Sequence, residues 1–243
     1  MTAKSLLRCG VGACLVLGLL GATVVDDFAV TTVAASWQKL AYSGGQTSEA
    51  AGKFWFHSRD VNAQSATDDF AVAGYLCKTH KVDTLAAWTI ELDYGLTLPA
   101  MSGSNLAGVG GFLQFGDPAA GVTSATELLN GYSLLVARDS VGYRLYVSTW
   151  DAGTISAEDV FAGLPATGRL VVTYSPSNGL LRILVNGTVR AQYPGFAAEN
   201  AFGRFAHFGF GGYSGEYSSF FTHANKVWVD NFRASGTGIV AGQ

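Results

Sequence analysis

After the first two dozen residues of this chain, strand-like runs recur between turn signals, and apolar and polar residues alternate with a period of two in several of them. Such alternation predicts β-strands that bury one face. In the run GLLRILVNG, Leu181, Ile183 and Val185 would share one face, opposite Arg182 and Leu184. Further strands are expected in KFWFHS, DDFAVAGYL, LAAWTIELDYGL, GGFLQFG, GYSLLVARD, YRLYVSTW, GRLVVTYS, AHFGFGGY and KVWVDNFRA. Because no long stretch keeps a helical period, the pattern predicts an antiparallel all-β sandwich.

Turn signals separate these runs. Residues 139–142 read Asp-Ser-Val-Gly, 177–179 read Ser-Asn-Gly and 186–187 read Asn-Gly. The last two predict hairpins, since Asn and Gly tolerate the positive φ that tight hairpin turns need. Asn186-Gly-Thr188 also matches a glycosylation sequon, and we favour its role as a turn.

The first residues have the pattern of a secretory leader. Lys4 and Arg8 precede an apolar run that carries no charge until Asp26, and a basic start before a short apolar core is typical of a signal peptide. The core is short for a membrane span, which needs about 20 apolar residues. We therefore expect a leader helix over 1–24, cleaved or kept as an anchor, one domain over 25–235 and a flexible tail over 236–243. The mature protein would be secreted or cell-surface, without a membrane span.

Composition narrows the possible partners. Charged residues make up 14% of the chain, glycines number 31 and the net charge is −3. Nothing here offers the basic patch that nucleic acid requires. Without the leader, Cys77 is the one cysteine left, so no disulfide framework is expected and stability must come from a packed core.

Three segments together suggest a family. Asp26, Asp27 and Phe28 precede Trp37, a long hairpin spans 168–194, and a closing W-V-D-N-F strand follows the glycine-rich HFGFGGYS. In this order they resemble concanavalin A-like, laminin G-like jelly rolls. The resemblance implies two antiparallel sheets, one concave and one convex. It does not fix the function, because this fold carries lectins, hydrolases, lyases and adhesive modules.

The segment WTIELDYGL tests the enzyme alternative. Glu91 and Asp93 would share a strand face, as in laminarinase-like hydrolases that carry E-x-D-x-E or E-x-D-x-x-E. Positions 95 and 96 are glycine and leucine, so the second glutamate is missing. Glu127 or Glu216 could replace it from another strand. Otherwise Glu91 and Asp93 are the solvated side of a strand or contribute to ligand binding.

Other catalytic and cofactor patterns are absent from the sequence. The four histidines are dispersed, and no lyase strand motif, phosphate loop or zinc pattern is present. We lean toward a protein that is not an enzyme, and leave the question open.

Aromatic residues beside polar ones point instead to sugar binding, because pyranose rings stack on aromatic faces. Trp150 and Asp151 end one predicted strand. Tyr213, Glu216 and Tyr217 lie in a segment rich in glycine and serine. These two places are the candidate glycan contacts.

The resemblance also implies a structural calcium ion that joins the first and last strands. Asp230 would be a ligand, with Asp26 or Asp27 nearby. Calcium takes six to eight oxygens, and the sequence identifies one or two. The alternative is that Asp230 bonds the backbone at a sheet edge.

Three hypotheses follow. The first is a secreted, non-catalytic jelly roll that binds carbohydrate or a surface polymer. The second is a glycoside hydrolase or polysaccharide lyase of the same fold. The third is a self-associating structural subunit of a surface layer or filament. Ligand identity and oligomeric state stay open.

Overall fold

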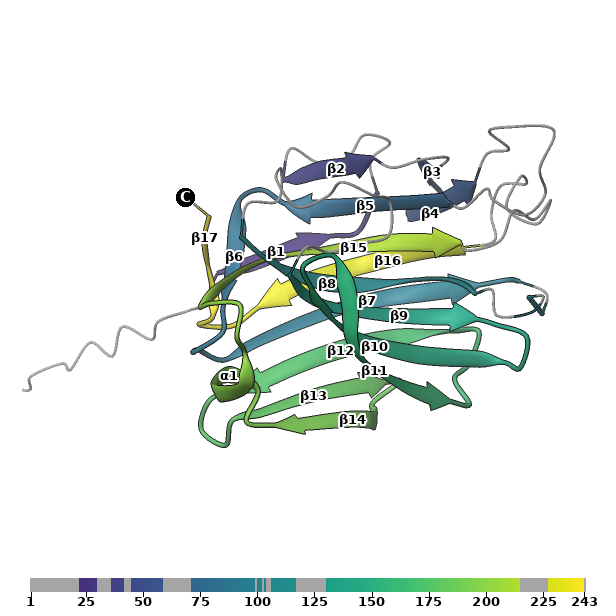
Figure 1. Cartoon of the computed structure of the whole chain (residues 1–243). Helices are drawn as coiled ribbons and strands as arrows, with labels where there is room; N and C mark the ends of the chain where they lie inside the picture. The colour runs from purple at the N-terminus through teal and green to yellow at the C-terminus, as the bar shows by residue number, and fades with distance from the viewer. Residues whose placement is uncertain are drawn as a thin grey trace, which may run out of the picture.

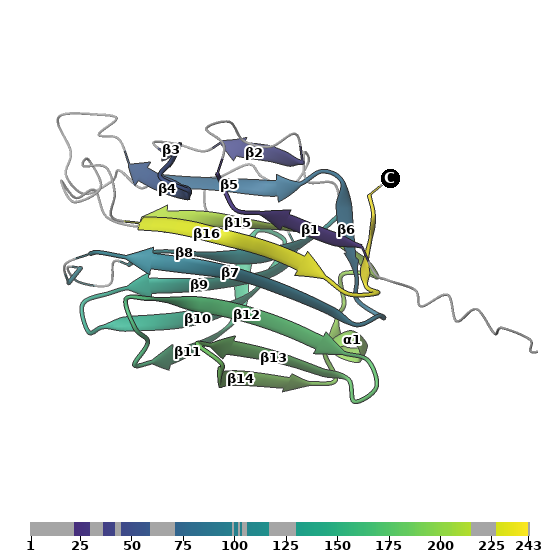
Figure 2. The ribbon, with the colours of Figure 1, turned by 180° about the vertical axis from the view of Figure 1, so that it is seen from behind.

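The computed structural model describes residues 22–29, 36–41, 45–58, 71–98, 100–101, 103, 106–116, 130–214 and 227–242. In this part of the chain, strands form two antiparallel sheets that pack face to face. Figure 1 and Figure 2, seen from opposite sides, show the strands of both layers running in roughly the same direction. This is the aligned packing of a sandwich, and it confirms the predicted all-β, two-sheet architecture.

We call the first layer the eight-stranded sheet. Its hydrogen-bonded order is β14-β13-β12-β7-β16-β4-β3, and β1 pairs with β16. Its strands are β1 (Thr23–Asp26), β3 (Gly45–Ala50), β4 (Lys53–Ser58), β7 (Trp88–Leu96), β12 (Thr167–Ser175), β13 (Leu180–Val185), β14 (Thr188–Pro194) and β16 (Val227–Ser235).

The second layer is the nine-stranded sheet. Its order is β11-β10-β9-β8-β15-β5-β2, while β6 pairs with both β15 and β17. Its strands are β2 (Trp37–Ala41), β5 (Ala71–Cys77), β6 (His80–Asp83), β8 (Ala107–Phe115), β9 (Gly131–Arg138), β10 (Tyr143–Asp151), β11 (Thr154–Ala162), β15 (Phe205–Ser214) and β17 (Ile239–Ala241).

The core lies between the sheets and is rich in aromatic rings. Phe210 of β15 is fully buried, and its ring centroid lies 4.9 Å from Trp37, 5.4 Å from Phe54 and 5.6 Å from Tyr75. Edge-to-face and offset contacts of this kind add to the free energy gained by burying the ring area. Cys77 is completely buried and free.

The segments behind the family resemblance meet in space. β1 pairs with the closing strand β16. Trp37 Nε1 donates to Asp26 Oδ2 at 2.7 Å, and the Phe28 N–H donates to Asp26 Oδ1. The first segment is therefore fastened to the core beside the last strand. β1 begins at Thr23, two residues before the expected domain start.

The two predicted hairpins join β12 to β13 and β13 to β14. Gly179 has φ +62°, and Asn186 and Gly187 have φ +50° and +75°. These left-handed conformations are the ones that Asn and Gly supply at low cost.

The C-terminal segment differs from the flexible tail expected over 236–243. β17 pairs with β6, and Ile239 is buried. The short run of apolar residues extends one end of the nine-stranded sheet because that end leaves β6 with an open edge. Apart from the strands, α1 (Phe196–Glu199) places the buried Phe196 against Trp88 and Tyr174. The expected leader helix lies outside the described residues, and no described helix has the length and apolar character needed to cross a membrane.

Candidate functional site

The outward side of β10 carries a row of polar and aromatic side chains. In the run YRLYVSTW, Leu145 and Val147 face the core, so Arg144, Tyr146, Ser148 and Trp150 face outward by alternation. All four are partly or largely shielded by their neighbours. With the adjoining outward residues of β9 and β11 they form a surface that we call the β10 outer face.

Asp139 fixes one end of this surface. Its Oδ1 accepts the N–H groups of Val141 (2.7 Å) and Gly142 (2.8 Å). Its Oδ2 accepts the Tyr146 hydroxyl at 2.8 Å and lies 2.9 Å from Arg144 Nε. One nearly buried carboxylate therefore closes the β9–β10 turn and orients both outward side chains.

The ionisation of this group follows from its contacts. Burial alone would raise the pKa of Asp139, but the N–H groups of Gly142 and Val141, the Tyr146 hydroxyl and the Arg144 charge together hold it below its ordinary value. Burial and the hydrogen bond to Asp139 raise the pKa of Tyr146 to about 12. At neutral pH the pair is a carboxylate with a neutral phenol donor.

The other end of the surface is fixed by hydrogen bonds between neighbouring strands. Trp150 Nε1 donates to Ser133 Oγ of β9 at 2.8 Å, and Ser148 Oγ donates to Glu158 Oε1 of β11 at 2.8 Å. Ile155 and Val160 of β11 pair with Trp150 and Tyr146 and are 43% and 44% exposed.

Along the β10 outer face, an apolar patch is followed by a polar stretch and then by a second apolar patch. Tyr146 with Val160 forms one apolar patch, Trp150 with Ile155 forms the other, and Ser148 and its partners lie between them. The two rings lie four positions apart along β10, or about 14 Å at 3.4 Å per residue. Rings held in place by their own hydrogen bonds, with hydroxyls and a carboxylate between them, can stack on sugar faces and bind sugar hydroxyls.

The two predicted glycan contacts share this sheet but do not lie together. Trp150 aligns across β9 and β8 with His207 of β15, and Tyr213 is six residues further along β15. That offset is about 20 Å along the strand and three strands across. Asp151 is exposed at the end of β10. Glu216, Tyr217 and the possible acid Glu127 lie outside the described residues.

Glu91 and Asp93 lie on the other layer, on the outer face of β7. Arg169 of β12 pairs with both, at 2.9 Å from Glu91 and 3.9 Å from Asp93, and Asn231 Nδ2 donates to Asp93 Oδ2 at 2.8 Å. The strand and its alternation agree with the prediction, since Trp88, Ile90, Leu92 and Tyr94 are buried.

The carboxylates predicted to hold calcium lie near one another, beside the first and last strands of the eight-stranded sheet. Asp230 pairs with Asp93 across β16 and β7. Burial and the charges of Asp93 and Asp27 raise the pKa of Asp230, against a hydrogen bond from Asn231 and the charge of Lys53. Within the described residues, no group of three or more His, Cys, Asp or Glu could hold a metal ion. Asp26 also accepts two hydrogen bonds, and a calcium ion at Asp230, Asp26 and Asp27 stays a prediction.

Reasoning from the sequence found Trp150 and missed its neighbours. Strand alternation places every second residue before Trp150 on the same face. It could therefore have identified Ser148, Tyr146 and Arg144. Asp139 was recognised as a turn residue. Its link to Tyr146, seven residues away, depends on the hairpin geometry.

Comparison with known proteins supports the fold. No family model matches this chain, and no curated protein matches it. Among solved structures, the carbohydrate recognition domain of Emp46p in its potassium-bound form is 15% identical, with a TM-score of 0.60, over 88% of this chain and 96% of that one. Lectin II from Ulex europaeus is 10% identical, with a TM-score of 0.58, over 89% and 98%. A protein of unknown function with a galectin-like fold from Bacillus subtilis is 14% identical, with a TM-score of 0.57, over 91% and 98%.

At these identities the likeness is one of fold. It agrees with the paired antiparallel sheets, the hairpins and the meeting of the first and last strands described above. This chain has the lectin-like, concanavalin A-like jelly-roll fold.

Proposed function

We propose that this protein binds carbohydrate through the β10 outer face and acts outside the cell without catalysing a reaction. The observation that carries the proposal is the pair of fixed rings, Tyr146 and Trp150, separated by the Ser148–Glu158 hydrogen bond. The neighbours named as carbohydrate recognition domains and lectins support it at the level of the fold.

The chemistry of the surface favours a neutral glycan. Asp139 and Glu158 already accept hydrogen bonds from Tyr146 and Ser148. The hydroxyl donors of Tyr146 and Ser148 are therefore already used, and the surface offers a ligand oxygen acceptors and ring faces. The cation of this surface, Arg144, is paired with Asp139. A polyanionic glycan would meet two carboxylates, which disfavours it.

A glycan array followed by calorimetric titration tests the proposal. With the best array ligand, Trp150→Ala should weaken binding by about tenfold or more, because truncating a central ring removes its stacking area. Trp55→Ala is the matched control. Trp55 is partly exposed on the outer face of the eight-stranded sheet, and its loss should leave affinity unchanged. Equal losses in both variants would count against the β10 outer face.

The extracellular location rests on the leader pattern. Amino-terminal sequencing of the secreted protein should find a start near residue 22–25, whereas an intact Met1 in a membrane fraction would favour the anchor.

Self-association is a second candidate, favoured by β11. No described strand pairs with its outer edge, and its residues are exposed on both faces except Phe161. An open edge strand is a template for pairing with another chain. Sedimentation velocity over a range of concentrations would show it as a rising mean mass.

A further inference from the structure

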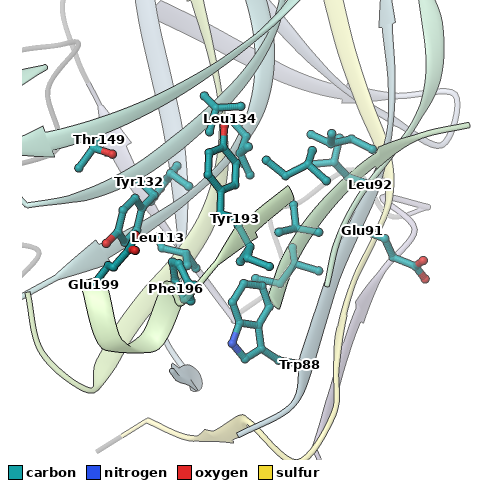
Figure 3. A pocket seen from close by; sticks show the side chains of 18 residues that line it. Trp88, Glu91, Leu92, Leu113, Tyr132, Leu134, Thr149, Tyr193, Phe196 and Glu199 are labelled. Carbon is teal, nitrogen blue, oxygen red and sulfur yellow. The ribbon is translucent and has the colours of Figure 1, made fainter. Parts of the chain in front are cut away.

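A cavity lies between the two sheets, away from the ring cluster around Phe210. Its walls come from β7, β12 and β13 on one side and from β8, β9 and β10 on the other, and α1 closes one end. The cavity has a volume of about 230 Å³. Figure 3 shows Trp88, Leu92, Leu113 and Phe196 around it, with Tyr132 and Glu199 together at one side.

The lining is almost wholly apolar. Aliphatic side chains and aromatic rings supply most of it, and the polar groups are Thr149, the hydroxyls of Tyr132 and Tyr193, and Glu199. Glu91 also borders the cavity, but its carboxylate is directed away from the centre (Figure 3), toward Arg169. Among the described residues, no Lys, Arg or His lines the cavity.

The lining side chains on one side of the cavity are more buried than those on the other, and this difference shows where the cavity opens. On the deep side, Trp88 and Leu92 are each 2% exposed. On the β9–β10 side, the inward residues Leu134, Val147 and Thr149 are partly exposed. The opening therefore lies along the free edges of the two sheets, between β11 and β14.

One hydrogen bond crosses this opening. Tyr193 of β14 donates from its hydroxyl to Asp159 Oδ2 of β11 at 2.9 Å. Asp159 pairs with Val147 and so faces inward. The two strands belong to different sheets, so this bond links the edges of the sandwich beside the cavity.

We propose that this cavity binds a small, uncharged, largely apolar molecule. An apolar cavity of about 150 Å³ stays dry and takes up benzene, so the larger space here accommodates two fused rings or a short alkyl chain. The carboxylates at its rim, Glu199 and Asp159, lie where a head group would sit, and no lining cation offsets them. A fatty acid or another organic anion is disfavoured by this like charge. This site is independent of the β10 outer face, because Val147 and Trp150 point to opposite sides of the same strand.

Two fluorescent dyes with the same ring system test the proposal on the full chain. 1-Aminonaphthalene is neutral at pH 7, and 5-aminonaphthalene-1-sulfonate adds a sulfonate. Titration of the neutral dye should give a saturable fluorescence increase at one site per chain. The sulfonate dye should bind about tenfold more weakly or worse, as expected for a charge placed beside two carboxylates. No saturable binding of the neutral dye, or tighter binding of the sulfonate, would overturn the proposal.

Matched variants place the dye in the cavity. Val147→Phe fills the space near the opening and should weaken binding of the neutral dye by about tenfold. Val189→Phe makes the same change on β14 at an exposed valine that does not line the cavity, and should bind like the parent. Equal affinities in the two variants would show that the dye binds elsewhere.

Gly111→Ala is a milder probe in case Val147→Phe does not fold. An added Cβ at Gly111 would lie 3.5 Å from Gly209 O and 3.9 Å from Leu92 Cδ2, which is ordinary contact. It should leave the melting temperature close to that of the parent and weaken the neutral dye by about threefold, the cost of one lost methyl contact. Unchanged affinity in this folded variant would contradict the site.

Discussion

Replacing Asp139 by Asn tests whether one carboxylate organises the β10 outer face. Asn keeps the shape and can still accept the N–H groups of Val141 and Gly142. It loses the charge that faces Arg144 Nε and strengthens the bond from Tyr146. Hydrogen bonds to a charged group contribute about 1.5–3 kcal/mol, against about 0.5–1.5 kcal/mol for neutral ones.

Three hydrogen bonds to Asp139 would weaken, while the ion pair counts for little because Arg144 is partly exposed. The three bonds share one carboxylate, so their separate losses of about 1 kcal/mol each do not add in full. We expect Asp139→Asn to lower the free energy of unfolding by about 2 kcal/mol. For a domain of this size that is a fall of about 4–8 °C in melting temperature at pH 7.

The difference in melting temperature between the parent and Asp139→Asn should depend on pH, and this dependence tests the role of the charge most directly. Asp139 has a lowered pKa in the folded state, so its contribution is fully present above its unfolded pKa of about 3.9. It is lost as the pH falls through the folded pKa. The melting temperatures of parent and variant, measured by circular dichroism, should therefore differ at pH 7 and converge as the pH falls through the folded pKa of Asp139. A gap under about 1 °C at pH 7, or one that persists in acid, would refute this reasoning.

Three further predictions follow from other contacts. Gly110→Ala should lower the free energy of unfolding, measured in urea, by about 2–4 kcal/mol, because the added Cβ would collide with the Leu134 carbonyl oxygen. In the control Gly142→Ala the added Cβ has room, and the same free energy should change by less than about 0.5 kcal/mol. Glu91→Gln should cost less than about 1 kcal/mol by the same measurement, since its partner Arg169 is half-exposed. EDTA should leave the melting temperature unchanged, since no group of three or more His, Cys, Asp or Glu among the described residues could hold a metal ion; a clear fall would support the calcium hypothesis at Asp230.

Alternation in the sequence predicted the strands that bury one face. It missed strands that are exposed on both faces and strands that form only by pairing with a distant segment. β7 and β13 alternate cleanly because each packs one side against the core. β11 reads as polar and acidic because it is an exposed edge, so no apolar period marks it. β17 is three residues long, and β6, more than 150 positions earlier in the chain, makes it a strand.

The candidate site was partly predictable for a similar reason. Trp150 stands out by residue type, and alternation could have added Tyr146. Its distance from Tyr213 depends on three intervening strand pairings, which local sequence does not encode. The cavity depends on how far two sheet edges lie apart, which is a property of packing and not of any one segment.

Mapping a bound glycan by amide hydrogen exchange tests the central claim most directly. With the ligand chosen from the array, the account predicts added protection in β9, β10 and β11, around Ser133, Tyr146 and Trp150. It also predicts no change in β7 or β16 near Glu91 and Trp228. Protection confined to the eight-stranded sheet would contradict the account.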